Sequence, residues 1–169
     1  MAELSVQERL LPSLLDRLED NEREKTAESR DRRTLTSQQI QDRVKRDLEW
    51  LMNAANLGAQ LDADAFPHVA RSVLNYGLPP LSGLSLNASD VAELERRLYD
   101  AIRNFEPRIL PGTLQVGLAL KSAQHDHRAL TFDIAGEMWA QPIPIRLFLR
   151  TEVDLDVGAV KVTDNAGYR

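Results

Sequence analysis

The sequence predicts an α+β fold in which N-terminal helices precede a small, mainly antiparallel C-terminal β-sheet with an exposed edge. A change in the spacing of apolar residues, and a proline at the point of change, support this prediction. Apolar residues follow a helical period up to residue 105, and then recur at every second position after residue 113. Helices grouped before strands, rather than alternating with them, are typical of α+β domains. Pro107 lies at the change and disfavours helical geometry in the residue before it.

The first long helix is expected over residues 37–56. Thr36 followed by Gln39 fits a capping box, in which each residue satisfies an amide at the start of the helix. The apolar residues of this segment recur at the spacing of one helical face. They are Ile40, Val44, Leu48, Leu51, Met52 and Ala55.

Two further helices are expected over residues 66–76 and 88–105. Gly77 can close the first because glycine tolerates the left-handed cap conformation. Asn87 or Ser89 can cap the second. Their apolar faces consist of Phe66, Val69, Ala70, Val73 and Leu74 in the first helix, and of Val91, Leu94, Leu98, Ile102 and Phe105 in the second.

Four half-buried strands are expected in the last third of the chain, over residues 114–120, 130–134, 145–156 and 159–162. The last is short and is the expected edge of the sheet. An edge strand carries main-chain groups that can accept a strand from another chain, although charged side chains can also protect it. The candidate residues for a contact at this edge are Arg150, Glu152, Asp154, Val160 and Val162.

The first 35 residues are expected to form an arm that precedes the main domain of residues 36–169. Residues 16–33 carry seven acids and six bases with almost no apolar residue, which is typical of a solvated linker. Before and within this linker, four leucines have the spacing of one helical face. These candidates for docking, on this domain or on a partner, are Leu11, Leu14, Leu15 and Leu18.

The composition excludes several classes of function. A net charge of −5 and a pI near 5.3 argue against nucleic acid as a partner. Cysteine is absent, which removes disulfides and thiolate sites. Neither a secretory signal nor an apolar run of about 20 residues is visible, so we expect a cytoplasmic protein that does not insert into a membrane.

Metal and cofactor sites are not expected. The histidines of His125-Asp126-His127 lie in a polar loop between two strands, and the sequence places no third or fourth ligand beside them. His68 stands alone on the helix expected over 66–76. The only enzyme hypothesis with candidate residues is glycoside hydrolysis by a carboxylate pair, Glu106 and Glu137.

The residues around Glu106 favour an ion pair over acid catalysis. Arg108 lies two positions away, and a neighbouring cation favours the ionised carboxylate, whereas a general acid must hold a proton. Aromatic residues make up only 5% of the chain, which is few for a sugar-binding platform. Because Pro107 fixes the backbone, Glu106 and Arg108 should project from a rigid corner where they can pair with a partner or with each other.

Four segments, in this order, resemble one family. They are Pro12–Leu18, Val44–Asn53 with its V-x-R-D-L-E pattern, Ser72–Leu78 with its S-V-x-N-Y-G pattern, and Ile102–Ile109 with its F-E-P-R pattern. Together they resemble the TssE family of type VI secretion baseplate subunits, related to myophage baseplate wedge proteins once labelled lysozyme-like. The resemblance covers most of residues 10–155. Met52 and Ile109 replace leucines of the family pattern.

The resemblance implies a structural role without catalysis in a contractile injection machine. Family members lie in a membrane-docked, cytoplasmic baseplate beside TssF, TssG and TssK, and link this wedge to the first ring of the TssB–TssC sheath. It also implies that Glu106-Pro107-Arg108 makes wedge contacts, and that the C-terminal sheet is similar to the strand-exchange domain of the sheath. We expect the isolated chain to be a monomer.

Overall fold

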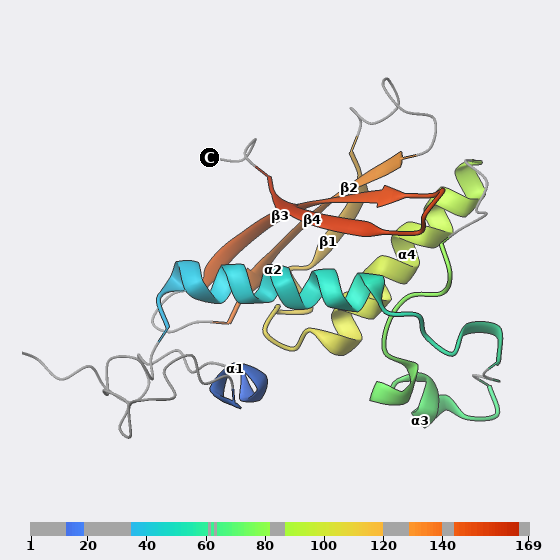
Figure 1. Cartoon of the computed structure of the whole chain (residues 1–169), viewed down its shortest axis with the longest axis horizontal. Coiled ribbons are helices and arrows are strands. Elements are labelled where there is room, and N and C mark those ends of the chain that lie inside the picture. The colour runs from blue at the N-terminus through green and yellow to red at the C-terminus, as the bar shows by residue number, and fades with distance from the viewer. Residues whose placement is uncertain are drawn as a thin grey trace, which may run out of the picture.

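A computed structural model describes residues 13–18, 35–60, 62, 64–81, 87–119, 129–139 and 144–165. It confirms the α+β fold, with helices followed by an antiparallel sheet (Figure 1). The helices are α1 (Leu14–Leu18), α2 (Ser37–Asn53), η3 (Gly58–Gln60), α3 (Pro67–Ala70), η4 (Val73–Asn75) and α4 (Ala88–Phe105). The strands are β1 (Gln115–Leu118), β2 (Ala129–Met138), β3 (Ile145–Asp154) and β4 (Val160–Asp164). Leu11, most of the charged linker and His125-Asp126-His127 lie outside the described residues.

Both long helices begin at the caps that the sequence predicts. At the start of α2, the Thr36 hydroxyl accepts from the Gln39 amide at 3.2 Å, and the Gln39 side chain accepts from the Thr36 amide at 2.9 Å. At the start of α4, the Asn87 side chain accepts from the Asp90 amide at 2.7 Å. These bonds satisfy amides that would otherwise lack partners, so they fix where each helix begins.

The prediction of a single helix over residues 66–76 is wrong. This segment forms one short α-helical turn, α3, and one 3₁₀ turn, η4. The break lies at Ser72, whose hydroxyl accepts from the Leu74 amide at 3.3 Å, while the Asn75 side chain donates to the Ala70 carbonyl at 3.0 Å. Hydrogen bonds between these polar side chains and the main chain here take the place of the main-chain hydrogen bonds of a helix. None of the five side chains of the predicted apolar face belongs to the core: Phe66, Val73 and Leu74 are exposed, and Val69 and Ala70 are half-buried.

Gly77 closes this segment as expected and turns the chain back against the end of α2. Its φ of +115° disfavours any residue with a side chain. The close approach is fixed by two main-chain bonds, from the Leu78 amide to the Ala54 carbonyl at 2.8 Å and from the Asn56 amide to the Leu78 carbonyl at 3.0 Å.

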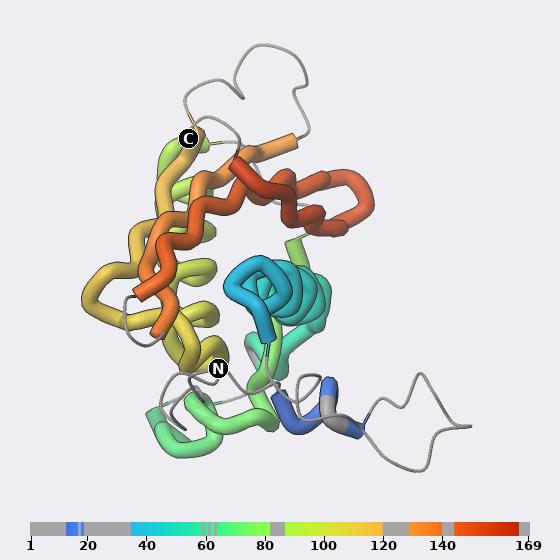
Figure 2. Tube along the Cα trace, turned by 90° about the vertical axis from the view of Figure 1, so that its left-hand side faces the viewer, coloured from blue at the N-terminus to red at the C-terminus, as the bar shows by residue number. Residues whose placement is uncertain are grey.

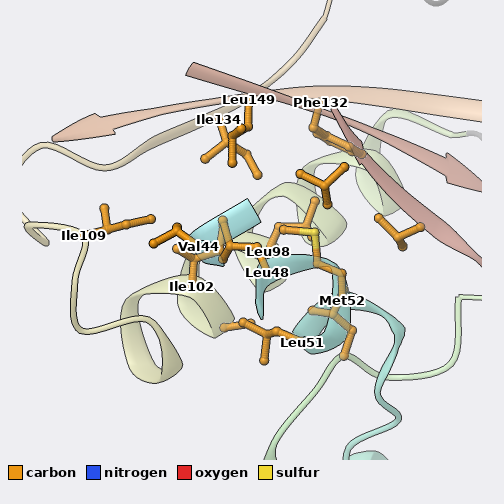
Figure 3. Close-up of a cluster of buried hydrophobic side chains, with 14 of the residues drawn as sticks. Val44, Leu48, Leu51, Met52, Leu98, Ile102, Ile109, Phe132, Ile134 and Leu149 are labelled. Carbon is orange, nitrogen blue, oxygen red and sulfur yellow. The ribbon is translucent and has the colours of Figure 1, made fainter. Parts of the chain in front are cut away.

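The four strands pair in the order β1-β2-β3-β4, each antiparallel to the next. α2 and α4 lie side by side on one face of the sheet, with α2 along β4 and α4 along β1 (Figures 1 and 2). The core fills the space between helices and sheet (Figure 3). It includes Val44, Leu48 and Leu51 of α2, Leu98 and Ile102 of α4, Phe132 and Ile134 of β2, and Leu149 of β3.

Burial of these side chains is the main stabilising contribution to the fold, since each buried leucine, isoleucine or phenylalanine contributes about 1.5–3 kcal/mol. In the described part of the chain, no helix is both long enough and apolar enough to cross a bilayer.

Candidate functional site

The Glu106-Pro107-Arg108 corner joins α4 to the sheet. The Glu106 amide donates the last helical bond of α4, to the Ile102 carbonyl at 2.9 Å. The next residues run beside the end of β2, where the Trp139 amide donates to the Arg108 carbonyl at 2.8 Å. Pro107 lies exposed between them. The corner is therefore held at both ends by main-chain bonds.

Glu106 and Arg108 form an ion pair within the chain. The Glu106 side chain is only 4% exposed. Its Oε1 accepts from the Arg108 Nε at 2.6 Å and from the Arg108 main-chain amide at 3.1 Å, and its Oε2 accepts from the Arg108 Nη2. This fork-like pairing is among the strongest that side chains form.

A second carboxylate extends the pair to α2. The Arg108 Nη2 also donates to Asp47 Oδ2 at 2.6 Å. Asp47 Oδ1 accepts from Arg46, at 3.0 Å from Nε and 2.8 Å from Nη2. Arg46 and Arg43 in turn contact Asp16 of α1, at 2.8 and 3.1 Å. We call the six residues Asp16, Arg43, Arg46, Asp47, Arg108 and Glu106 the charge chain.

The charge chain shifts the pKa of Arg108 and of the neighbouring Tyr76 phenol. Burial lowers the Arg108 pKa, but hydrogen bonds and charges, first of Glu106 and then of Asp47, outweigh it and raise the pKa above its ordinary value. Burial raises the pKa of the Tyr76 phenol, and the negative charges of Asp47 and Glu106 raise it further. Arg108 is thus a permanent cation and Tyr76 a neutral phenol.

A groove of about 520 Å³ runs beside the charge chain. Four separate parts of the chain supply its apolar walls: Leu15 of α1, Trp50 and Leu51 of α2, Tyr76, and Phe105 with Pro107. The Tyr76 and Phe105 rings meet edge to face, with centroids 5.3 Å apart. The Arg46 guanidinium lies 4.6 Å from the centre of the Trp50 ring. The site is thus an apolar groove with a neutralised, rigid polar rim.

α1 is attached to α2 through its aspartate, and its leucines stay largely exposed. The Asp16 side chain is almost fully buried against Arg43 and Arg46, and the Ser13 hydroxyl donates to it at 2.6 Å. The three described leucines of the predicted docking face are instead 71%, 52% and 73% exposed: Leu14, Leu15 and Leu18. The helix presents an apolar face next to the groove.

Comparison with known proteins decides the family. Residues 38–143, more than half of the chain, match the family model described as baseplate wedge protein gp25. The chain belongs to the gp25 family of baseplate wedge proteins. This is the family that the sequence motifs resemble, and it makes the chain a structural component of a phage-tail-like baseplate.

Two further comparisons add little to this assignment. A crystal structure of a Geobacter sulfurreducens protein, described as a candidate tail lysozyme, is 14% identical. The match covers 80% of this chain and 98% of that one, with a TM-score of 0.44, too low to support an argument about function. No protein among those with curated descriptions matches the chain.

The residues predicted at the sheet edge do not join the corner. Arg150 pairs with Asp133 across β2 and β3, with its Nε 2.8 Å from Oδ1, and Asp154 accepts from two amides of the turn before β4. Glu152 is exposed on the same face. The Val160 and Val162 side chains are buried in the core. Whether these residues contact a partner stays a prediction.

The proposed catalytic carboxylates are not brought together. Glu106 lines the groove, whereas Glu137 does not, and Glu137 alternates along β2 with the core-facing Gly136 and Met138. Its side chain therefore lies on the opposite face of the sheet from the helices. His68 is exposed on α3, and no cluster of potential metal ligands occurs among the residues that the structure describes.

Sequence reasoning missed four members of the charge chain: Asp16, Arg43, Arg46 and Asp47. All but Arg43 lie within motifs that resemble the family, which is the signal that could have marked them. Their pairing could not be read from the motifs, because Asp47 and Arg108 are 61 residues apart in sequence.

Proposed function

We propose that this gp25-family chain is the wedge subunit TssE of a type VI secretion system. In this proposal it lies in the cytoplasmic, membrane-docked baseplate with TssF, TssG and TssK. It links the TssF–TssG wedge to the first ring of the TssB–TssC sheath and helps to start sheath assembly. It has no catalytic activity and needs no cofactor.

The observation that supports this proposal most is the charge chain beside the apolar groove. It ties α1, α2 and the end of α4 into one rigid unit, so a partner can dock with little loss of conformational entropy. The acids and bases neutralise each other, and the groove then offers Trp50, Tyr76, Phe105 and the outward leucines of α1 as apolar anchors. Aromatic anchors in a groove with a polar rim are typical of protein interfaces.

The partner that fits this surface is an amphipathic helix of the TssF–TssG wedge. A helix lays its apolar side chains into a groove at one-turn spacing. Pro107 would meet it at the rim, where Arg108 and Glu106 hold the corner in place. The ion pair of Arg108 and Glu106 would thus contribute to binding in two ways: it fixes the position of the corner, and it contacts the partner helix directly.

The same pair argues against the glycosidase alternative. A glycosidase needs a protonated carboxyl group next to the scissile bond and a second carboxylate at a defined separation. Glu106 instead accepts three hydrogen bonds from Arg108, so its carboxylate oxygens are already engaged within the chain. Glu137 lies on the other face of the sheet and cannot complete the pair.

Substitution of Arg108 tests the wedge proposal. Arg108→Ala should reduce the TssF–TssG recovered with the tagged chain at least tenfold, because the corner loses both of its carboxylate contacts. Arg108→Lys should recover only part of the binding, since a single ammonium cannot replace the bidentate fork.

The matched control is Arg96→Ala, which removes an arginine that is also ion-paired, to Glu93, but lies on the exposed face of α4. It should leave recovery unchanged. Circular dichroism would establish that each variant is folded. Full recovery of TssF–TssG by folded Arg108→Ala would overturn the proposal that this corner binds the wedge.

A further inference from the structure

α1 is held against α2 by the polar contacts of one residue. Asp16 Oδ1 accepts from the Arg46 Nη2 at 2.8 Å, and Asp16 Oδ2 lies 3.1 Å from the Arg43 Nη1. The second contact is not a hydrogen bond, since the Arg43 Nη1 has no hydrogen-bond partner. Among the described residues, no main-chain hydrogen bond joins α1 to another element. A single carboxylate therefore provides the polar attachment of this helix.

Apolar burial adds little to the attachment. Leu14, Leu15 and Leu18 remain 71%, 52% and 73% exposed, so most of their apolar surface stays in contact with water. The hydrophobic contribution to stability scales with the apolar area removed from water. The ion pairs are also weakened by solvent, because the side chains of Arg43 and Arg46 are 28% and 31% exposed. The docked state of α1 is thus favoured by a small margin.

The rest of the charge chain does not depend on α1. Arg46 also donates to Asp47 Oδ1 at 2.8 Å, and Asp47 Oδ2 accepts from Arg108 at 2.6 Å. Asp16 lies at one end of this series of contacts, so its departure breaks none of the others. The carboxylate of Asp16 keeps one bond within α1 itself, from the Ser13 hydroxyl at 2.6 Å.

The connection between α1 and the main domain is long enough for the helix to leave its site. Residues 19–34 separate α1 from Leu35, which precedes α2. A chain of this length reaches about 50 Å when extended, far more than Asp16 must move to lose its contacts. α1 lies beside α2 and away from the sheet (Figure 2). Its release therefore requires no change in α2 or in the sheet.

α1 also forms one wall of the groove. Ser13 and Leu15 line the groove from α1, whereas the facing walls come from α2, Tyr76 and residues 105–108. Asp16 and Arg43 are not among the lining residues. The contact that holds this wall in place thus lies outside the surface that a partner would touch.

We propose that α1 is a detachable wall of the groove, which docks and undocks as a unit through Asp16, and that the groove binds its partner fully only while α1 is docked. Docking and binding are then linked. A partner that contacts both walls favours the docked state, and a docked α1 raises the affinity for the partner by the same factor. The link to a partner rests on the proposed TssF–TssG contact, whereas the docking equilibrium is a property of the isolated chain.

Two substitutions outside the groove test the link to binding. Asp16→Asn removes the charge that holds α1, and should weaken the binding of TssF–TssG to the full-length chain at least tenfold. Arg43→Gln removes one of the two cations and should weaken it less. The double variant should bind as Asp16→Asn does, because both changes break the same attachment.

Asp42→Asn is the matched control, a change at an acid of α2 whose side chain is 54% exposed. It should bind TssF–TssG as the unmodified chain does. Binding of Asp16→Asn with the affinity of the unmodified chain would overturn the link between α1 and the groove, while the proposed function would stand.

Amide hydrogen exchange of the isolated chain tests detachment without a partner. The amides of residues 16–18 should be protected at least a hundredfold less than those of Leu48 and Leu51, because α1 opens while the core stays folded. Asp16→Asn should lower the protection of α1 further and leave that of Leu48 and Leu51 unchanged. Equal protection of α1 and the core of α2, or no effect of Asp16→Asn on α1, would overturn the detachable wall.

TssF–TssG should have the reciprocal effect on α1. At saturation it should raise the protection of residues 16–18 in the unmodified chain at least tenfold, as linkage requires. Unchanged protection at saturation would overturn the link. Failure of the unmodified chain to bind TssF–TssG would instead overturn the proposed function, and exchange in the isolated chain would still decide whether α1 detaches.

Discussion

The Arg108 guanidinium donates hydrogen bonds to two carboxylates that lie in different parts of the fold. Glu106 lies two residues before it, at the end of α4, whereas Asp47 lies in the middle of α2. The sequence allowed the inference that an adjacent cation would hold Glu106 ionised, because that effect is local. It could not indicate Asp47, because only the packing of α2 against α4 brings the two together. Contact of Arg108 with a partner chain stays a prediction.

The two carboxylates should differ in their contribution to stability. The Glu106 side chain is 4% exposed and holds three bonds, so Glu106→Ala should lower the free energy of unfolding by about 3 kcal/mol, since it leaves a partly buried guanidinium poorly paired. The Asp47 side chain is 21% exposed, and solvent screening should limit the cost of Asp47→Ala to about 1 kcal/mol. Urea unfolding would measure both.

The control for this pair is Glu93→Ala, which breaks exposed ion pairs with Arg96 and Arg97 on α4. It should leave the urea midpoint unchanged. An Asp47→Ala variant less stable than Glu106→Ala would contradict the ranking, because exposure would then not govern the strength of these pairs.

At the scale of elements, the sequence predicts those structures whose causes are local. α2 and α4 follow from a 3.6-residue period with a polar cap, and the strands follow from alternation. The helix expected over residues 66–76 failed because Ser72 and Asn75 bond to nearby main-chain groups, a competition that apolar periodicity does not register. β2 likewise continues beyond the expected 130–134 to Met138, since pairing with β3 extends the strand through Gly136.

Gly77 offers a test of how this segment is held against α2. A Cβ at this position would lie 2.1 Å from the Ala54 carbonyl oxygen, and the φ of +115° is itself unfavourable to alanine. Gly77→Ala should therefore destabilise the fold by about 3 kcal/mol, from backbone strain and displacement of the bonds between Leu78 and Ala54. Thermal unfolding would measure it.

Gly112→Ala is a matched control, because a Cβ there meets no atom within 4 Å and the residue lacks a positive φ. Its melting temperature should equal or slightly exceed that of the unmodified chain. Equal stability of the two variants would mean that the turn at Gly77 can relax without cost.

At the scale of the whole molecule, polar contacts rather than apolar ones determine which surfaces stay available. Asp16 attaches α1 to α2 and leaves the leucines of α1 outward, although the sequence suggested those leucines as the docking face and left the partner open. Asn53 of α2 similarly bonds to the amide and carbonyl of Val160 on β4. Neither arrangement follows from periodicity, because both depend on one polar side chain reaching another element.

Attachment of α1 should depend on pH in a defined direction. Burial raises the Asp16 pKa, but the hydrogen bonds from Ser13 and Arg46 and the charges of Arg43 and Arg46 outweigh it, so the pKa lies below its ordinary value of 3.8. Because the carboxyl pKa is lower in the docked state, the ionised carboxylate stabilises docking fully above pH 3.8. This stabilisation is lost as the pH falls through the lower pKa of the docked state. α1 should thus stay docked from pH 5 to 8 and detach only in stronger acid.

A fluorophore on α1 can measure this attachment, because the chain lacks cysteine and Leu15→Cys creates a single labelling site on an exposed position. Leu15 and Trp50 line the same groove, so Trp50 should quench the label while α1 is docked. Asp16→Asn should relieve quenching at every pH, whereas Asp42→Asn, a matched change at an exposed acid of α2, should not. Equal quenching in the two variants at pH 7 would show that α1 is held by contacts other than Asp16, and that its leucines are not kept outward by this ion pair.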